Sequence, residues 1–347
     1  MVATNTLGQV IYEALRAEDG PPVRQVADLL GASEAEAREI TDHILREWEE
    51  AGLFETEPRD FLETPPHRPA RDPKVITYRL GDNAVTMVCE HRQLLDQIHA
   101  LLSRIDHTPG PGGEETVEIL SMGDRFGIFT DGTPLFGTCG INAARYLVVR
   151  DMFERLVGRD RAAVSIHAGS VGKDGRALIL AGSSGAGKTT LTLGLARVGC
   201  DYLADDHVVL DRDTRHIFAL PVRASAKVRS WELEEVAPYL ASADQPMPRL
   251  GVRPAMPPGA VPMGSRHEVA ALVFPGFNAE AENRLDRLSP EDAFLRFIDS
   301  GARPARHFKS IAPIAELLNT VPCYALQHNS SEFSVPACLD LLQSSLR

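Results

Sequence analysis

The sequence predicts an α/β protein in which a small helical module precedes a larger domain of sheet and helices. Three observations support this division. Residues 5–56 carry three short amphipathic helical patterns in succession. The stretch 64–74 is rich in proline, which can neither continue a helix nor pair freely in a sheet, so it is predicted to be a linker. Further along, an apolar run at 177–180 leads through a glycine-rich loop into a helical run, the order of a strand, a turn and a helix.

The composition is that of a globular protein of two or three domains. The chain has 347 residues, of which 44% are hydrophobic and 24% are charged. Its net charge of -12 argues against a general binder of nucleic acid or acidic membranes, because phosphate groups demand a basic surface. The five cysteines are scattered without a C-x-x-C pair, which indicates reduced thiols, and no run approaches the length of a membrane span. We therefore expect a cytoplasmic protein that binds neither nucleic acid nor membrane.

The N-terminal module, residues 1–63, is predicted to be a helix-turn-helix or winged-helix unit. Ser33 and Glu36 form a capping box that opens its third helix, and apolar residues then recur four apart on one face. Between Ser33 and Glu50, seven acidic residues stand against two arginines, a charge that would repel DNA. Two roles stay open for this module: binding of a peptide or protein, and a purely structural role.

The middle segment, residues 75–159, is predicted to be a small α+β unit that packs on the domain after it. Apolar patterns of period two predict strands, and patterns of period three to four predict helices. We expect strands at 75–80, 84–88, 117–120 and 125–129, helices at 91–105 and 141–156, and a loop at 108–113. No pattern in this segment points to chemistry. The remaining residues, 160–347, form the predicted catalytic domain.

The glycine-rich loop at 182–189 matches the phosphate-binding pattern G-x-x-x-x-G-K-[ST]. Its glycines let backbone N–H groups approach phosphate oxygens, and the following helix adds the positive end of its dipole. Lys188 is expected to reach the β- and γ-phosphates, and Thr189 to give its hydroxyl to Mg²⁺. The predicted nucleotide-binding residues are Gly182, Ser183, Ser184, Gly185, Ala186, Gly187, Lys188, Thr189 and Thr190.

Two adjacent carboxylates, Asp205 and Asp206, follow the loop closely at the end of an apolar run. One carboxylate can accept a proton from an attacking hydroxyl, and the other can hold Mg²⁺ or its water. The alternative is a pair of loop aspartates that caps a turn. Upstream of the loop, His167 ends a strand-like segment. A single histidine is usually structural, and this one is of interest because of the motifs that follow it.

Together these motifs resemble the catalytic domain of HPr kinase/phosphorylase and its relatives. The matching segments are residues 166–169, 182–189, 198–199 and 203–206, and the resemblance covers about 160–347. It implies a fold similar to that of phosphoenolpyruvate carboxykinase, with a mixed sheet and helices. It also implies ATP and Mg²⁺ as cofactors and a homo-oligomeric assembly.

The resemblance implies a role for each site residue. Lys188 holds phosphates, Thr189 binds Mg²⁺ and Asp206 lies near the metal, whereas Asp205 acts as the base toward a serine hydroxyl. The chemistry of these residue types predicts the same roles. His167 orients the site, a role that rests on the resemblance alone.

The chain departs from the family pattern after the aspartates, where a metal-binding glutamate and an arginine-rich signature are expected. The glutamates near the expected place are Glu232, Glu234 and Glu235. Arg266 is a candidate phosphate clamp, and its rivals are Arg223, Lys227, Arg229, Arg249 and Arg253. The stretch 243–264 holds six prolines and three glycines, so we expect it to be a lid, a binding loop or a disordered segment.

Residues 5–56 also resemble the PqqD-like winged helix that grips leader peptides in natural-product pathways; Val26, Leu30, Trp48 and Gly52 are among the matching residues. We therefore expect an ATP-dependent serine kinase whose peptide or protein substrate, for instance a ribosomally made precursor peptide, is recruited by the N-terminal module. Two alternatives stay open. One is a regulatory protein that senses a nucleotide without transferring phosphate, and the other is a kinase of a small-metabolite hydroxyl.

Overall fold

The computed structural model describes residues 23–30, 33–35, 37–38, 41, 67–135, 137–213, 215–241, 252–308 and 310–344. It contains helix α2 (Val23–Leu30), the second of the three helices predicted for the N-terminal module. Val23, Val26 and Ala27 of this helix are buried. The predicted first helix, most of the third and the first part of the linker lie outside the described residues. The winged-helix and PqqD-like interpretations therefore stay predictions.

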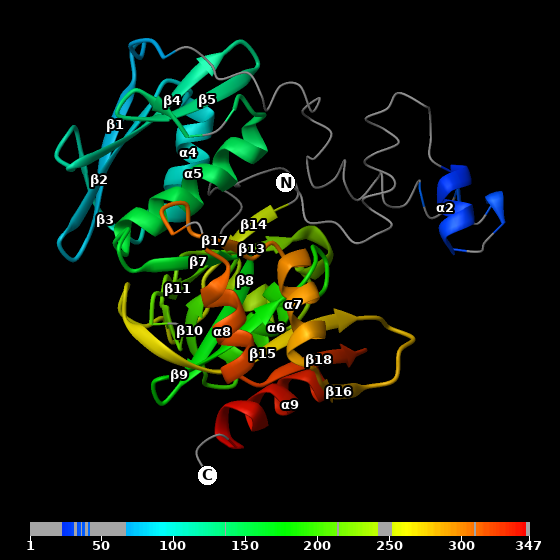
Figure 1. Cartoon of the computed structure of the whole chain (residues 1–347). Helices are drawn as coiled ribbons and strands as arrows, with labels where there is room; N and C mark the ends of the chain where they lie inside the picture. Colours follow the sequence, from blue (N-terminus) through cyan, green and yellow to red (C-terminus); the bar gives the residue numbers. More distant parts are fainter. Residues whose placement is uncertain are drawn as a thin grey trace.

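A six-stranded sheet with two helices forms the upper part of the molecule in Figure 1. Its strand order is β3-β1-β2-β4-β5-β6, in which β2 and β4 are parallel and the other neighbours antiparallel. The bounds are β1 (Lys74–Leu80), β2 (Asn83–Cys89), α4 (Arg92–Leu102), β3 (Asp106–Pro109), β4 (Glu115–Met122), β5 (Arg125–Thr130), β6 (Thr133–Pro134) and α5 (Ile141–Leu156). The sequence predicted four of these strands and both helices. The loop predicted at 108–113 is wrong in its first two residues, because they belong to β3.

The core of this part lies between the sheet and its two helices. On α4, Leu94, Ile98 and Leu102 are buried on one face, and the side chain of His91 caps the helix by accepting a hydrogen bond from the backbone N–H of Leu94. The same apolar cluster includes Phe218, which belongs to the larger sheet. The segment 75–159 and the domain after it thus share buried apolar surface, and the domain boundary at 159/160 stays a prediction.

The end of the predicted linker is bound to the first sheet. Arg68 donates from its two terminal nitrogens to the two carboxylate oxygens of Glu90, at 2.6 and 2.8 Å. The backbone N–H groups of Arg71 and Ser121 donate to the same carboxylate, at 2.5 and 2.8 Å. These hydrogen bonds, chiefly that from Arg68, lower the pKa of Glu90 to about 2. Residues 68–71 therefore have a fixed place rather than the freedom of a linker.

A ten-stranded mixed sheet forms the second part. The main path of strands is β10-β8-β9-β15-β12-β11-β7-β17, and β18 pairs with both β15 and β16. The bounds are β7 (Ala162–Ile166), β8 (Ala168–Lys173), β9 (Arg176–Ala181), β10 (Asp201–Ala204), β11 (Val208–Asp211), β12 (His216–Phe218), β15 (Arg266–Phe277), β16 (Arg284–Arg287), β17 (Arg303–Pro304) and β18 (Cys323–His328). Strand β15 runs parallel to both β9 and β18, while the other pairs are antiparallel.

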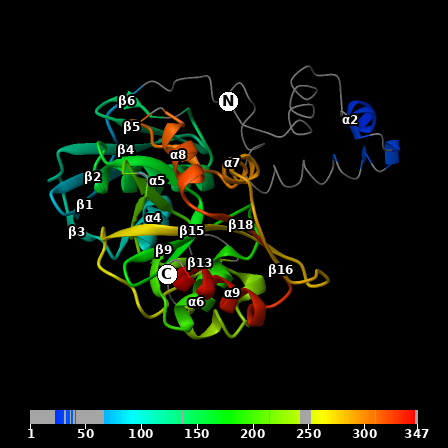
Figure 2. The ribbon, with the colours of Figure 1, turned by 60° about the horizontal axis from the view of Figure 1, so that its bottom comes forward.

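Helices cover both faces of this sheet, as Figure 2 shows with α7 and α8 above β15 and α6 and α9 below it. The bounds are α6 (Lys188–Arg197), α7 (Pro290–Asp299), α8 (Ala312–Thr320) and α9 (Ser331–Ser344). Side chains on β9 alternate between the two layers: Ile179 packs in the cluster of α7 and α8, and Leu178 and Leu180 in the cluster of α6 and α9. The predicted mixed α/β fold is confirmed at this level.

The stretch 243–264, expected to be a lid, a binding loop or a disordered segment, contains a short strand in the part that the structure describes, and its role as a lid or binding loop stays a prediction. Residues 252–255 form β14 (Val252–Ala255), which pairs antiparallel with β13 (Ala224–Lys227). Short 3₁₀ helices follow β13 at η1 (Val228–Ser230) and η2 (Ala237–Tyr239). The proline-rich composition did not indicate this strand. Pro254 can take a ladder position here because β13 and β14 form a sheet of two strands, and proline is tolerated in edge strands. Among the described helices, none has both the length and the apolar composition needed to cross a bilayer.

Candidate functional site

The predicted phosphate loop joins β9 to α6 and holds two glycines in the left-handed region of backbone conformation. Gly185 and Gly187 have φ values of +92° and +94°, a region in which a β-carbon would be strained. The amide of Ala186 donates to the carbonyl of Ser183 at 3.3 Å. Gly182, Ser183 and Ser184 precede these turns, and Thr190 lies in the first turn of α6. All nine predicted nucleotide-binding residues are therefore consecutive around the N-terminus of one ten-residue helix.

Lys188 is buried at the start of α6, with 7% of its surface exposed. Its Nζ donates to the carbonyl oxygens of Gly182 and Ser183, at 2.7 and 3.1 Å. Burial lowers the pKa of Lys188, and the carboxylates of Asp206 and Asp205 oppose that effect. The ammonium group thus lies inside the loop, between the loop carbonyls and the acid pair.

The acid pair follows β10, beside the loop. The carboxylate of Asp205 is 2% exposed and accepts hydrogen bonds from the hydroxyl of Thr189 and from the backbone N–H of Ser225, the latter at 3.1 Å. Thr189 lies on α6 and Ser225 on β13, so Asp205 connects three elements. The sequence assigned Thr189 and Asp205 to one site but did not indicate Ser225, and the structure places Thr189 and Asp205 in contact.

Asp206 occupies the turn between β10 and β11 with a φ of +66°, a left-handed conformation that aspartate tolerates better than most residues. Its side chain is 32% exposed, and the carboxylate lies 3.9 Å from Nδ1 of His167. The same nitrogen of His167 lies 3.1 Å from the backbone oxygen of Asp206. His167 thus contacts the turn that carries the acid pair, as its predicted orienting role requires.

The two aspartates have pKa values shifted in opposite directions. Burial, and secondarily the neighbouring charge of Asp206, raise the pKa of Asp205 to about 7. Burial also raises the pKa of Asp206, but His167, a hydrogen bond with Ser225 and the charge of Lys188 outweigh it, so this pKa lies below its usual value. Asp206 is therefore a permanent anion at neutral pH. Asp205 titrates close to neutrality, where a general base works best.

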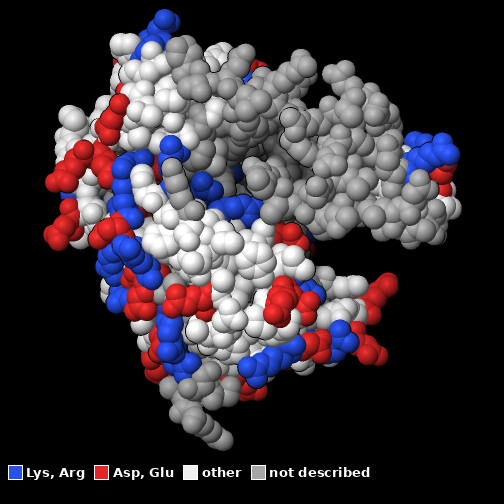
Figure 3. Space-filling view, viewed as in Figure 1, with Lys and Arg blue, Asp and Glu red and all other residues white. Residues whose placement is uncertain are grey.

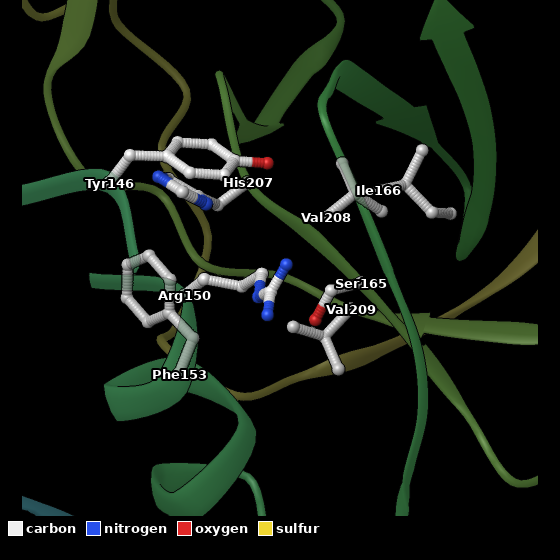
Figure 4. Close-up of a pocket in the computed structure, with 8 residues that line it drawn as sticks. All are labelled: Tyr146, Arg150, Phe153, Ser165, Ile166, His207, Val208 and Val209. Atoms are coloured by element: carbon white, nitrogen blue, oxygen red, sulfur yellow. The ribbon is translucent and has the colours of Figure 1, made fainter. Parts of the chain in front are cut away.

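Helix α5 of the middle segment brings aromatic and basic side chains to this site, which the sequence did not indicate. The ring of Tyr146 stacks on His207 at 5.1 Å and meets His167 edge-on at 6.1 Å. Figure 4 shows this stack at one end of a narrow pocket, with the guanidinium of Arg150 directed toward Ser165. Amphipathic spacing alone cannot distinguish such residues from the core-facing residues of α5, because both lie on its buried side.

Three arginines, Arg145, Arg150 and Arg303, lie near the stack of Tyr146 and His207, together with the carboxylates of Asp206 and Glu154. Burial, assisted by the guanidinium groups of Arg150 and Arg145 and opposed by Asp206, lowers the pKa of His207 to about 3. Burial raises the pKa of Tyr146, an effect that Arg150 and Arg303 oppose. Figure 3 shows Lys and Arg side chains gathered where the parts with the two sheets meet. His207 is therefore neutral and lies beside these arginines.

Of the candidate phosphate clamps, two lie at the loop and one lies far from it. Lys227 donates from Nζ to the hydroxyl of Ser184 at 2.7 Å. A β-carbon placed on Gly185 would lie 2.8 Å from the guanidinium of Arg229. Arg266 instead pairs with Asp211 and Asp213 at 2.7 and 3.0 Å, at the start of β15. The loop lies near the other end of that strand, nine residues or about 30 Å away, so Arg266 is wrong as a clamp.

Two of the candidate metal-binding glutamates point elsewhere. Glu234 pairs with Arg197 at 3.1 Å, and Glu235 packs against Gly194. Both contacts lie in the second half of α6, about 10 Å or more from Lys188 at its start. No cluster of three His, Cys, Asp or Glu side chains with metal-binding geometry occurs in the described residues.

The oxygen atoms at the loop nevertheless fit Mg²⁺. This ion is typically held by one or two carboxylates together with the phosphates of the substrate, and it keeps several waters. The hydroxyl of Thr189 and the carboxylates of Asp205 and Asp206 supply such oxygens next to Lys188. A dense protein cage is not required.

The fold defines a mixed α/β protein, in which residues 182–189 carry the sequence pattern of a phosphate-binding loop. No protein-family profile matches the chain, and no curated protein matches it. Among solved structures, the chain is similar to the Hpr(Ser) kinase/phosphatase from Coxiella burnetii, with a TM-score of 0.26 and 11% sequence identity over 52% of this chain and 96% of that chain. A likeness at this level carries no argument about activity, so the function proposed below is based on the residues of this chain.

Proposed function

We propose that this protein is an ATP-dependent kinase that transfers the γ-phosphate to a serine-type hydroxyl of a peptide or protein. The observation that carries the proposal is the contact between the phosphate loop and a buried acid: Thr189 and Asp205 touch, and the pKa of Asp205 is raised toward neutrality. A nucleotide sensor needs the loop but has no use for a base beside it.

Each residue has one task in the proposed reaction. Loop amides and Lys188 bind the β- and γ-phosphates, and Lys227 and Arg229 approach the loop at Ser184 and Gly185. Bound Mg²⁺, held by Thr189 and Asp206, would neutralise charge on the phosphates. The acceptor hydroxyl gives its proton to Asp205 while its oxygen forms a bond to the γ-phosphorus. The bond from that phosphorus to the β,γ-bridging oxygen breaks, and ADP leaves with the electron pair.

The acceptor enters, in this proposal, from the side of His167, Tyr146 and His207. Positive charge from Arg145 and Arg150 favours an acceptor with negative charge near its hydroxyl. The N-terminal module would deliver the peptide that carries this hydroxyl. An acidic peptide therefore fits this side of the site better than a basic one.

The experiment that tests the proposal follows γ-labelled ATP with serine-containing candidate peptides, acidic and basic, on the full chain. Asp205→Asn is expected to abolish labelling while the Kd for ATP changes less than about threefold, since the variant keeps the hydrogen-bonding shape of the side chain. Full labelling by this variant would contradict the role of Asp205. Binding of ATP without labelling of any acceptor by the wild type would favour the sensor.

The matched variant Asp206→Asn separates the two aspartates. Loss of the negative charge of Asp206 is expected to raise the Mg²⁺ concentration needed for half-maximal labelling. The opposite pattern, a metal defect in Asp205→Asn and a pure transfer defect in Asp206→Asn, would exchange the two roles. Labelling of a free hydroxy metabolite with no labelling of any peptide would favour the small-molecule kinase.

A further inference from the structure

Strands β15 and β18 extend past the end of β9, so their last residues lie alongside the phosphate loop. Leu180, the next-to-last residue of β9, pairs with Val273, and Phe277 lies four residues further along β15, about 13 Å away. Phe277 pairs in turn with His328, the last residue of β18. Because the three strands are parallel, their carboxyl ends lie on the same side of the sheet, which is also the side of the loop. Phe277 and His328 form a wall on that side.

This wall contacts the helix end of the loop. A β-carbon placed on Gly187 would lie 3.6 Å from Cβ of Phe277 and 3.7 Å from Nε2 of His328. The opposite end of the loop, at Ser184 and Gly185, faces Lys227 and Arg229. The two ends of the loop therefore have different neighbours. Two cationic side chains lie at its tip, and the rings of Phe277 and His328 lie at the end that leads into α6.

The two rings differ in what they offer a ligand. Phe277 is 54% exposed, so its face is open to solvent beside the loop. His328 is 5% exposed and meets the ring of Phe277 edge-on at 5.6 Å. Aromatic faces of this kind stack on nucleic-acid bases regardless of base identity.

The backbone of Ser330 interacts with the buried imidazole of His328, and at least one of the two ring nitrogens has no hydrogen-bond partner within the described residues. Burial lowers its pKa, although the backbone of Ser330 opposes this, so the ring is neutral and offers one donor and one acceptor. A buried polar group without a partner costs about 1–3 kcal/mol, and native proteins seldom keep such a group unless a ligand or water satisfies it.

We propose that Phe277 and His328 hold the nucleoside end of the bound nucleotide, with the base stacked on Phe277 and a polar nucleoside atom bonded to His328. This inference rests on the proposed nucleotide site. It gives the triphosphate an orientation, with the base at Gly187 and the γ-phosphate at Ser184 and Gly185. No covalent step is involved.

The test compares a ligand with a base to one without. Calorimetry with Mg²⁺ measures Kd for ATP and for inorganic tripolyphosphate on the wild type, Phe277→Ala and Phe277→Trp. Phe277→Ala is expected to weaken ATP about 5- to 100-fold and to change tripolyphosphate less than twofold, and Phe277→Trp is expected to retain ATP affinity. Leu295→Ala, at a 65% exposed apolar residue on α7, is the control and should leave both ligands unchanged.

His328→Asn keeps a polar side chain of smaller size, and it is expected to weaken ATP more than tripolyphosphate. Equal weakening of both ligands by Phe277→Ala, or no weakening of either, would overturn the inference while the proposed kinase activity stands. If the wild type binds neither ATP nor tripolyphosphate, the proposed function falls and this inference falls with it. Thermal unfolding of each variant shows whether a loss of binding reflects a loss of fold.

Discussion

The hydroxyl oxygen of Thr189 lies 3.2 Å from each of the two carboxylate oxygens of Asp205. Thr189 is the second residue of the helix after the phosphate loop, and Asp205 directly follows the strand that returns from that helix. The contact links the part of the site that binds phosphate to the part that would remove a proton. A shift in either residue is therefore expected to affect both steps.

Gly169 on β8 packs closely against the residues that make this contact. A β-carbon there would lie 2.1 Å from Oγ1 of Thr192 and 3.5 Å from Oδ1 of Asp205. Gly169→Ala is expected to lower the free energy of unfolding by about 1–3 kcal/mol and to reduce transfer, because Thr192 and its neighbours must move. Denaturant unfolding and peptide labelling measure the two effects.

Gly276→Ala serves as the control for that variant, since the nearest atom to a β-carbon there lies 3.8 Å away and it is expected to be tolerated. Adding Thr192→Ala to Gly169→Ala removes the closest obstacle and should recover part of the stability. If the midpoint of denaturant unfolding is unchanged in Gly169→Ala alone, β8 and α6 can move apart without loss of stability, which contradicts the prediction.

Arg229 and Arg266 form a second matched pair. Arg229→Ala is expected to lower kcat for transfer on the order of 10- to 1000-fold, because it removes a cation beside the loop tip that can stabilise the transferring group. Arg266→Ala breaks ion pairs to Asp211 and Asp213 far from the loop, so kcat should stay within about twofold. Equal kcat values for the two variants would remove Arg229 from the mechanism.

Tyr146 is expected to act through its ring. Its stack on His207, at 5.1 Å and 29°, contributes about 0.5–1.5 kcal/mol beyond burial. Tyr146→Phe should therefore keep transfer, and Tyr146→Ala should lower kcat about 2- to 10-fold with an unchanged Kd for ATP. Steady-state kinetics together with ATP binding separates the two parameters, and a change in Kd for ATP would place the effect at the loop instead.

Glu90 predicts a dependence of stability on pH. The carboxylate has its pKa lowered from about 4.5 to about 2, so its stabilising effect is complete above pH 4.5 and is lost as the pH falls toward 2. Glu90→Gln is expected to lower the free energy of unfolding by about 1–3 kcal/mol at pH 7, a difference that shrinks between pH 4.5 and 2. Glu268→Gln, at an exposed ion pair with Arg215, should change it by less than about 1 kcal/mol at any pH.

The sequence predicted well what depends on local pattern. The loop residues are consecutive, so their spacing alone specifies a strand, a turn and a helix. Asp205 was predicted to join them because its apolar strand returns directly from the loop's helix. The strand pairs of the middle segment followed from period-two patterns bounded by turn residues.

What the sequence could not predict depends on segments that meet only after folding. Tyr146 reaches His207 because α5 packs against the larger sheet, and nothing in the pattern of α5 marks that residue. Phe277 and His328 meet through the register of two parallel strands, which sequence spacing does not determine. The position of Arg266 in the chain predicted a phosphate clamp. In the structure it lies at the start of β15, and the loop lies near the other end of that strand.

Strand β15 has a consequence for how the chain is made. Residues 176–181 leave the ribosome with one of their two sheet edges unpaired, and the parallel partner for that edge is not synthesised until residues 266–277. The second parallel partner of β15 comes later still, at residues 323–328. Such distant pairing closes slowly and leaves an apolar edge open to other chains. The strand that leads into the phosphate loop therefore cannot pair with β15 until about 85 further residues have been made, and the β15–β18 pair cannot form until residues 323–328 follow.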